Sequence, residues 1–266
     1  VQRNARHFSF CLVPEAEAIL RYKRAGAEPL FFPMAANPDR YRPMDTSYRY
    51  DATFSGQRYG DRTSSMLALL EGGVDAQAFG QYWDPAPAAG EPADGSGQAG
   101  ILARALKLAF GGRSVVQAMR DRMDWDRLRT RHQAALHGPV SDEQYVALFS
   151  ESRISLGFLI LGDTHRTSRP LRQIRLREFE APMAGAFYVT GWLDEIALHY
   201  EIGTEIVCYR SREELVDLSR YYLANDTERE TIRRAGYERA RRDHTWRRRF
   251  EDLFAELRRR RVITGA

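Results

Sequence analysis

Short apolar segments alternate with amphipathic segments along most of this 266-residue chain. The apolar segments have the length of single strands, and glycine, proline or polar turn residues bound them. The segments between them repeat apolar residues at helical spacing. Strands that alternate with helices favour a parallel sheet with helices on both faces. The expected fold class is therefore α/β, with a Rossmann-like parallel sheet and a helical C-terminal tail.

The predicted strands fall into two groups, which a proline-containing segment at residues 33–43 separates. The first group is one strand–helix–strand unit over residues 8–32. In the second group, strands are predicted at residues 52–55, 76–79, 134–136, 154–161, 187–189 and 206–209. Helices are predicted between them at residues 62–70, 103–110, 115–129, 141–151, 171–183 and 193–199.

The end of the chain predicts three helices with start signals. Ser211 and Thr227 each begin a Ser/Thr-x-x-Glu capping box, and Thr245 precedes the last helix, at residues 246–260. That helix carries one apolar stripe, which we expect to pack on the body of the protein: Trp246, Phe250, Leu253, Phe254 and Leu257.

Charge and composition exclude several classes of function. The net charge is +4, and much of the excess is arginine near the C-terminus. Acidic residues are interleaved with these arginines, which favours a solvated helical face and disfavours contact with nucleic acid. Peripheral contact of the arginine-rich tail with an anionic membrane surface is the alternative. No apolar run approaches the ~20 residues that cross a bilayer, and no secretory signal is visible, so a cytoplasmic location is expected. No Cys/His cluster has zinc spacing, and no metal site is predicted.

Residues 177–190 are the most informative segment for function. They predict a helix that carries a carboxylate, then a glycine stop and a short apolar strand. The spacing of Arg177, Phe179, Glu180, Gly185 and Thr190 resembles the donor-site segment of GT-B glycosyltransferases in the CgeB-like group, within the glycosyl transferases group 1 family. Segments 33–41, 54–62, 136–145, 221–224 and 235–246 resemble the same group in the same order.

This resemblance implies a sugar transfer from a nucleoside-diphosphate sugar to an unidentified acceptor, without a metal or a further cofactor. It divides the chain into a remnant of an acceptor-side domain with its linker (1–45), a nucleotide-sugar-binding domain (46–245) and a C-terminal helix (246–266). Only the last strand–helix–strand of the acceptor-side domain is recognisable. Either a missing domain or a second chain would complete the cleft, or the chain is a non-catalytic module that binds a nucleotide or a partner.

The loop at Gly56 is the expected phosphate site. Gly56 follows a strand and precedes a helix, a turn that lets backbone N–H groups approach a phosphate. Arg58 and Arg62 flank it and could form charge-assisted bonds to a diphosphate. The alternatives are a tight turn and two surface arginines.

The resemblance implies that Glu180 accepts hydrogen bonds from the ribose and that His137 and Gly138 lie near the base. Arg175 and Arg177 lie just upstream of Glu180, and alternate positions on a helix do not share a face, so only one of them is expected to neutralise phosphate. A surface glutamate and a histidine satisfied by backbone are the alternatives.

Asp163 and His165 are weak catalytic candidates, because they follow the longest apolar segment. A lone Asp-x-His is a poor metal signal. Many retaining relatives carry a glutamate eight positions before the one that aligns with Glu180. This chain has Arg172 there, which leaves the stereochemical outcome open.

Overall fold

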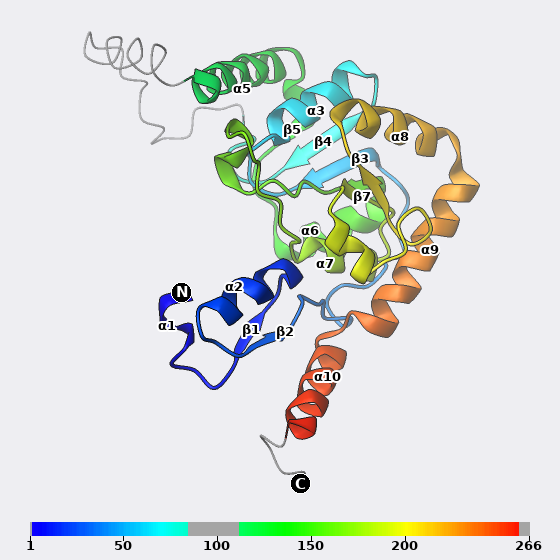
Figure 1. Ribbon diagram of the computed structural model, residues 1–266. Coiled ribbons are helices and arrows are strands. Elements are labelled where there is room, and N and C mark those ends of the chain that lie inside the picture. The colour runs from blue at the N-terminus through cyan, green and yellow to red at the C-terminus, as the bar shows by residue number, and fades with distance from the viewer. Residues whose placement is uncertain (1, 85–111, 261–266) are drawn as a thin grey trace.

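A computed structural model describes residues 2–84 and 112–260, and Figure 1 shows how the elements are arranged. The body is a six-stranded sheet in the order β5-β4-β3-β6-β7-β8, and every neighbouring pair is parallel. This confirms the predicted α/β class. The strands are β3 (Tyr50–Ser55), β4 (Ala76–Phe79), β5 (Leu136–His137), β6 (Ser152–Leu156), β7 (Tyr188–Gly191) and β8 (Val207–Tyr209).

Helices cover both faces of this sheet. Helices α3 (Arg62–Glu71), α5 (Gly112–Arg131) and α8 (Arg212–Ala224) pack on one face, and α6 (Asp142–Glu151) and α7 (Arg177–Met183) on the other (Figure 1). Each face has its own apolar core. Val189 of β7 belongs to the first core and its neighbour Tyr188 to the second, because successive strand residues point to opposite faces.

A second, smaller unit lies below the sheet in Figure 1, beside the last helix of the chain. Its strands β1 (Cys11–Val13) and β2 (Pro29–Phe31) pair in parallel. It also contains α1 (Gln2–Ala5), η1 (Ala16–Ala18) and α2 (Ile19–Arg24). Helix α9 (Asp226–Asp243) runs along the body, and α10 (Trp246–Arg259) continues to the small unit. The segment that leads from β2 to the body and the segment that joins α9 to α10 run side by side, because Ala36 pairs with Thr245.

Three predicted features differ from the structure near the candidate site. The strand predicted at 154–161 ends at Leu156 and continues as irregular chain to the short 3-10 helix η3 (Gly162–Arg166). The helix predicted at 171–183 begins only at Arg177, because Arg172 bridges to Ile160 in extended conformation. The helix predicted at 193–199 is the 3-10 helix η4 (Asp194–Leu198). At the sheet edge, the strand predicted at 134–136 begins only at Leu136, because the 3-10 helix η2 (Gln133–Ala135) precedes β5.

Two of the three helix caps predicted from the sequence are confirmed. Ser211 accepts a hydrogen bond from Glu214 N at 3.1 Å, and Thr245 accepts one from Arg248 N at 3.1 Å. The capping box at Thr227 is wrong, because α9 already begins after Asn225 and Thr227 lies in its first turn. The helix predicted at 103–110 lies outside the described residues.

The apolar stripe of α10 packs on the small unit rather than on the sheet. Phe32 contacts the rings of Trp246 and Phe250, at centroid distances of 6.3 and 5.4 Å. No residue of α10 is buried, and Phe250 and Phe254 are 44% and 46% exposed. The arginines of α10 pair within the helix, for example Arg247 with Glu251. No helix in the described ranges has the length and apolarity to cross a bilayer.

Two buried histidines join the body to α10. His244 Nε2 lies 2.8 Å from the backbone oxygen of His199, and Arg249 Nη2 lies 2.8 Å from His244 Nδ1. Arginine can only donate, so Nδ1 accepts and Nε2–H donates, which is the neutral tautomer. Burial, with the charge of Arg249, lowers the pKa of His244 to about 3 and that of His199 to about 4.

We expect the free energy of unfolding to decrease as the pH is lowered, because of these histidines. Both are neutral when folded but take up a proton near pH ~6.5 when unfolded, so their stabilisation is complete above that pH and is lost below it. Lowering the pH from ~7 to ~5 should reduce the free energy of unfolding by about 2 kcal/mol for each histidine. Urea denaturation at both values measures this. His244→Asn should remove about half of the dependence, whereas an equal dependence in this variant, or its loss in the exposed control His7→Asn, would contradict the assignment.

Candidate functional site

The centre of the sheet is a topological switch point. Strands β3 and β6 are neighbours, but β4 and β5 extend the sheet on one side and β7 and β8 extend it on the other. The loops that follow β3 and β6 therefore diverge. In open parallel sheets, ligands bind in the crevice that such loops leave at the carboxyl ends of the strands.

A cavity of about 310 Å³ lies where these two loops diverge. It brings together five of the eight residues predicted to bind the nucleotide: Gly56, Arg62, Arg175, Arg177 and Glu180. The rest of its lining comes from the β3–α3 loop, from α6 and from the start of α7: Gln57, Tyr59, Tyr145 and Leu176.

Gly56 forms a wall of the cavity that only a glycine permits. Its N–H donates to Phe79 O at 2.7 Å, and its carbonyl accepts from Trp83 Nε1 at 2.7 Å. A Cβ on Gly56 would lie 2.8 Å from Arg177 Nη2 and 2.9 Å from Phe54 Cζ. The Arg177 guanidinium thus occupies the space that a side chain at position 56 would need. Trp83 is fully buried and is a core residue.

Three guanidinium groups surround the cavity. Arg62 is 4% exposed, and it donates to Gln57 O at 2.6 Å and to Tyr59 Oη at 2.7 Å. Burial lowers the pKa of Arg62 to about 10, and the positive charges of Arg177 and Arg175 add to this effect. Arg62 therefore remains charged at neutral pH and is repelled by the positive charges of Arg177 and Arg175.

These arginines also have unused hydrogen-bond donors. Nε of Arg62, Nε of Arg177, and both Nε and Nη2 of Arg175 are buried and have no partner among the described residues. Buried donors without a partner are unfavourable, and donors that are also charged bind anionic oxygens most strongly. The cavity therefore offers an anion both charge and directed hydrogen bonds.

Glu178 holds the segment that carries these arginines. Its buried carboxylate accepts from Arg175 N at 2.6 Å, Tyr188 Oη at 2.9 Å and Thr190 Oγ1 at 3.2 Å. Burial raises the pKa of Glu178. Sequence reasoning missed this residue. The available signal was the polar pair Tyr188 and Thr190, which lie two residues apart on a strand and so share one face.

Glu180 lies two residues further along α7 and, unlike Glu178, lines the cavity. Its carboxylate accepts a hydrogen bond from Tyr145 Oη at 3.0 Å. Burial raises the pKa of Tyr145 to about 12, so its hydroxyl is a donor at neutral pH. Burial and the nearby Glu180 carboxylate also raise the pKa of Tyr41. Tyr145 thus orients Glu180, and the sequence had not assigned it a role at the site.

Arg58, His137 and Gly138 do not line this cavity. Arg58 Nε donates to Tyr82 O at 2.6 Å, and its guanidinium lies 3.9 Å from the ring centre of Trp125. His137 Nε2 lies 2.7 Å from Gln77 Oε1, and Gly138 O accepts from Gly80 N at 3.1 Å. These three residues lie on the β4–β5 side of the switch point.

Asp163 and His165 belong to an ion cluster between η3 and α5. His165 Nε2 and Arg166 Nε each lie 2.8 Å from the same oxygen of Asp121, and Arg166 Nη1 lies 3.2 Å from Asp163. Asp121 was missed by the sequence analysis. Within the described ranges, no group of three or more His, Cys, Asp or Glu residues could hold a metal ion.

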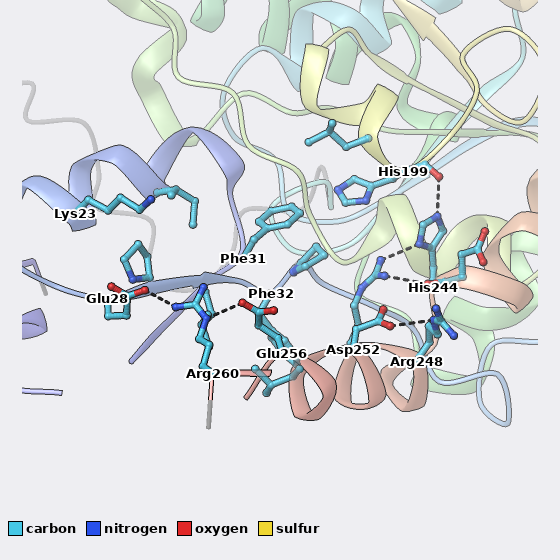
Figure 2. Close-up of a pocket in the computed structure, with 18 of the residues that line it drawn as sticks. Lys23, Glu28, Phe31, Phe32, His199, His244, Arg248, Asp252, Glu256 and Arg260 are labelled. Carbon is cyan, nitrogen blue, oxygen red and sulfur yellow. Dashed lines mark hydrogen bonds and ion pairs between the residues drawn. The ribbon is translucent and has the colours of Figure 1, made fainter. Parts of the chain in front are cut away.

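A larger cavity of about 670 Å³ lies between β2, η4 and α10 (Figure 2). It contains none of the predicted site residues. Its charged side chains largely satisfy one another, since Arg260 pairs with Glu28 and Glu256, and Arg248 pairs with Asp252. This balance contrasts with the unpartnered arginines at the switch point.

Comparisons with solved structures identify the fold. Similar structures include sucrose-phosphate synthase from Thermosynechococcus elongatus (12% identity, TM-score 0.60), Anabaena HepE in complex with UDP-glucose (11%, 0.62) and a glycosyltransferase from Rickettsia africae (10%, 0.55). The matches cover 96%, 96% and 90% of this chain, but 58%, 65% and 59% of those chains. The chain thus spans less than two thirds of their length, and identities this low show the fold alone. No curated protein sequence matches significantly.

The family comparison agrees with the fold. A family model described as glycosyl transferase-like matches residues 99–255, which is more than half of the chain. The parallel sheet with its C-terminal helices has the architecture that the resemblance to GT-B enzymes implied. The chain therefore belongs to the glycosyl transferase-like family.

Proposed function

We propose that this chain is the donor-binding part of a glycosyltransferase that moves a hexosyl group from a nucleoside-diphosphate sugar to an acceptor. The observation that carries the proposal is the cavity at the switch point, with its glycine wall, its unpartnered guanidinium donors and its oriented carboxylate. A diphosphate supplies the negative charge and the acceptor oxygens that these arginines lack.

Each group in the cavity has a role in this proposal. Arg62, Arg175 and Arg177 bind the diphosphate beside Gly56, and the nearby N-terminus of α3 adds a partial positive charge. Glu180 accepts hydrogen bonds from the ribose hydroxyls, and Tyr145 holds its carboxylate in place. Arg58 remains a predicted contact to the diphosphate, and His137 and Gly138 remain predicted contacts near the base.

The same groups also act in catalysis. Sugar transfer breaks the bond between the anomeric carbon and the diphosphate oxygen, so negative charge grows on the leaving diphosphate. Cations that the fold already holds around that position before the reaction stabilise the transition state. The proposed transfer therefore uses arginines at the leaving group and needs neither a metal nor a cofactor. Asp163 and His165 stay weak candidates for catalysis, and the cytoplasmic location stays a prediction.

The acceptor side is proposed to involve the small N-terminal unit. Residues 46–245 would bind the donor, residues 1–45 would belong to an acceptor-side domain with its linker, and residues 246–266 would return to it. A two-stranded parallel sheet is too small to be stable alone. The unit also approaches the donor loops, since Gln173 bonds to Glu15, and Ala16 N donates to Glu195 at 2.7 Å. Further domain sequence or a second chain would supply the acceptor pocket.

Glu180→Ala should weaken the binding of UDP by about tenfold or more, about 1.4 kcal/mol, because the ribose loses its carboxylate partner. UDP is the first nucleotide to test, because Anabaena HepE was solved with UDP-glucose. Isothermal titration measures the change. Glu238→Ala, at an exposed position of α9, is the matched control. Equal affinity of Glu180→Ala and wild type would remove Glu180 from the site.

Gly56→Ala should weaken UDP binding by about tenfold, because the new methyl displaces the Arg177 guanidinium and the Phe54 ring. The same overpacking should lower the free energy of unfolding by about 1–3 kcal/mol. The control is Gly72→Ala, which overpacks away from the cavity, since its Cβ would lie 2.6 Å from Val216 Cγ1. It should also lower the free energy of unfolding but leave UDP affinity unchanged. An equal loss of UDP affinity in both variants, measured by titration beside urea denaturation, would contradict the geometry.

Turnover separates an enzyme from a binding module. A glycosyltransferase should release UDP from UDP-glucose when simple sugars or water serve as acceptor, and the release can be followed by coupled detection of UDP. A non-catalytic module derived from half of a GT-B enzyme should bind UDP-glucose and leave it intact. Binding without any release would favour the module.

A further inference from the structure

The cavity of about 670 Å³ runs along an open edge of the small sheet. Six consecutive residues of β2 and its flanks line it, at positions 28–33. Successive side chains of a strand point to opposite faces, so a cavity on one face would meet only alternate residues. The cavity therefore follows the edge of the strand. Helix α2 borders it on one side and α10 on the other, and Leu198 and His199 line it where the small unit meets the body (Figure 2).

The backbone groups at this edge have no strand partner. Among the described strands, β2 pairs only with β1. Glu28 O accepts a hydrogen bond from β1 at 2.9 Å, and Phe32 N donates one to β1 at the same distance, so alternate residues of β2 face β1. The N–H and C=O of Phe31 and the C=O of Pro29 point to the opposite edge. No backbone group within residues 2–84 and 112–260 bonds to them there.

Unpaired backbone groups along a strand edge favour the addition of a further strand. In an antiparallel addition, the residue opposite Phe31 exchanges two hydrogen bonds with it. The residue two positions further along donates to Pro29 O. Pro29 has no N–H, so this edge offers one donor and two acceptors. The cavity also has the usual volume of a binding site, which is ~300–1,000 Å³. An extended peptide is the occupant that fits this shape.

The side chains along the groove leave room for such a peptide. Phe31 and Leu198 are 41% and 59% exposed, and both can pack against an apolar side chain. His199 is only 4% exposed, and its buried Nε2 has no hydrogen-bond partner among the described residues. Buried polar atoms are normally paired, so this ring also points to a bound group. Figure 2 shows Phe31 between Lys23 and His199.

The unpaired charge of the groove is positive. Its four carboxylates each pair with an arginine: Glu28, Asp243, Asp252 and Glu256. Arg249 directs its donors to two backbone oxygens and to His244. Lys23 of α2 is exposed, lines the groove and forms no ion pair with any residue that the structure describes. A peptide with an acidic side chain is complementary to this arrangement.

We infer that the open edge of β2 binds an extended segment of a partner protein, which adds as a third strand and directs an acidic side chain to Lys23. The inference is independent of the proposed function, because no residue that lines this groove lines the nucleotide cavity.

The first test selects displayed random heptapeptides on the immobilised chain and titrates the enriched peptides by fluorescence polarisation. We expect β-branched or aromatic residues at alternate positions, together with an acidic residue. Methylation of the one peptide N–H that donates to Phe31 O should weaken binding by about tenfold or more. The inference is overturned if no peptide is enriched, or if N-methylation at every position in turn leaves the affinity unchanged.

Phe31→Pro and Phe31→Val form a matched pair of protein variants. Both remove the ring, but only proline removes the outward N–H, and an edge strand tolerates proline. We expect Phe31→Pro to bind the selected peptide about tenfold more weakly than Phe31→Val. Equal affinities overturn the inference, provided that urea denaturation shows both variants to be folded. If Phe31→Pro does not fold, hydrogen exchange decides. Bound peptide must slow exchange of the Phe31 amide in the wild type, and an unchanged rate overturns the inference.

Charge reversal on α2 tests the acidic side chain. In the wild type, the selected peptide should bind more tightly than its analogue with glutamine in place of the acidic residue. Lys23→Glu should remove this preference. Arg24→Glu is the control, because Arg24 is the next residue of α2, is exposed and does not line the groove. A preference that survives Lys23→Glu, or that Arg24→Glu removes equally, overturns the assignment of Lys23.

A second copy of this chain is the competing occupant of the edge. Sedimentation velocity at the concentrations of the titration distinguishes the two. We expect no dimer that Phe31→Pro dissociates. Such a dimer would overturn the inference and assign the edge of β2 to self-association.

Discussion

The hydrogen bonds of the buried Glu178 carboxylate determine the geometry of the candidate site. They tie the backbone of Arg175 to Tyr188 and Thr190 of β7. As a result, the chain stays extended before α7, and α7 begins at Arg177. Burying a carboxylate is costly, and three donors together with the nearby charge of Arg177 offset part of that cost.

This anchoring concentrates positive charge at the switch point. The start of α7 brings Arg175 and Arg177 to the cavity that Arg62 lines from the other loop. Like charges that lie close together in a partly buried setting repel strongly, because water screens them poorly there. A bound anion removes this repulsion and satisfies the unpartnered donors at once. In the proposed function, the wall at Gly56 and the oriented Glu180 extend the same recognition to a nucleotide sugar.

Local signals allowed much of the fold to be predicted. The β4 strand has the predicted bounds, and the caps at Ser211 and Thr245 depend on hydrogen bonds between near neighbours in sequence. The resemblance placed Gly56 and Glu180 in the site, and one cavity does contain both.

The parts that the sequence could not predict depend on distant partners. The extended start of residues 171–183 requires Tyr188 and Thr190 to reach Glu178, and a bridge from Arg172 to Ile160. Helical periodicity contains no information about such contacts. The roles of Glu178 and Glu180 also could not be separated from sequence alone. Burial distinguishes them, because the first faces the sheet and the second faces the cavity.

The central claim is that the arginines at the switch point bind a diphosphate. Titration of the chain with uridine, UMP and UDP at low and high salt tests it most directly. We expect the affinity to rise by about tenfold with each phosphate, and added salt to weaken the binding of UDP most, because the added binding is electrostatic. Equal affinity for all three ligands, or UDP binding that salt does not change, would contradict it.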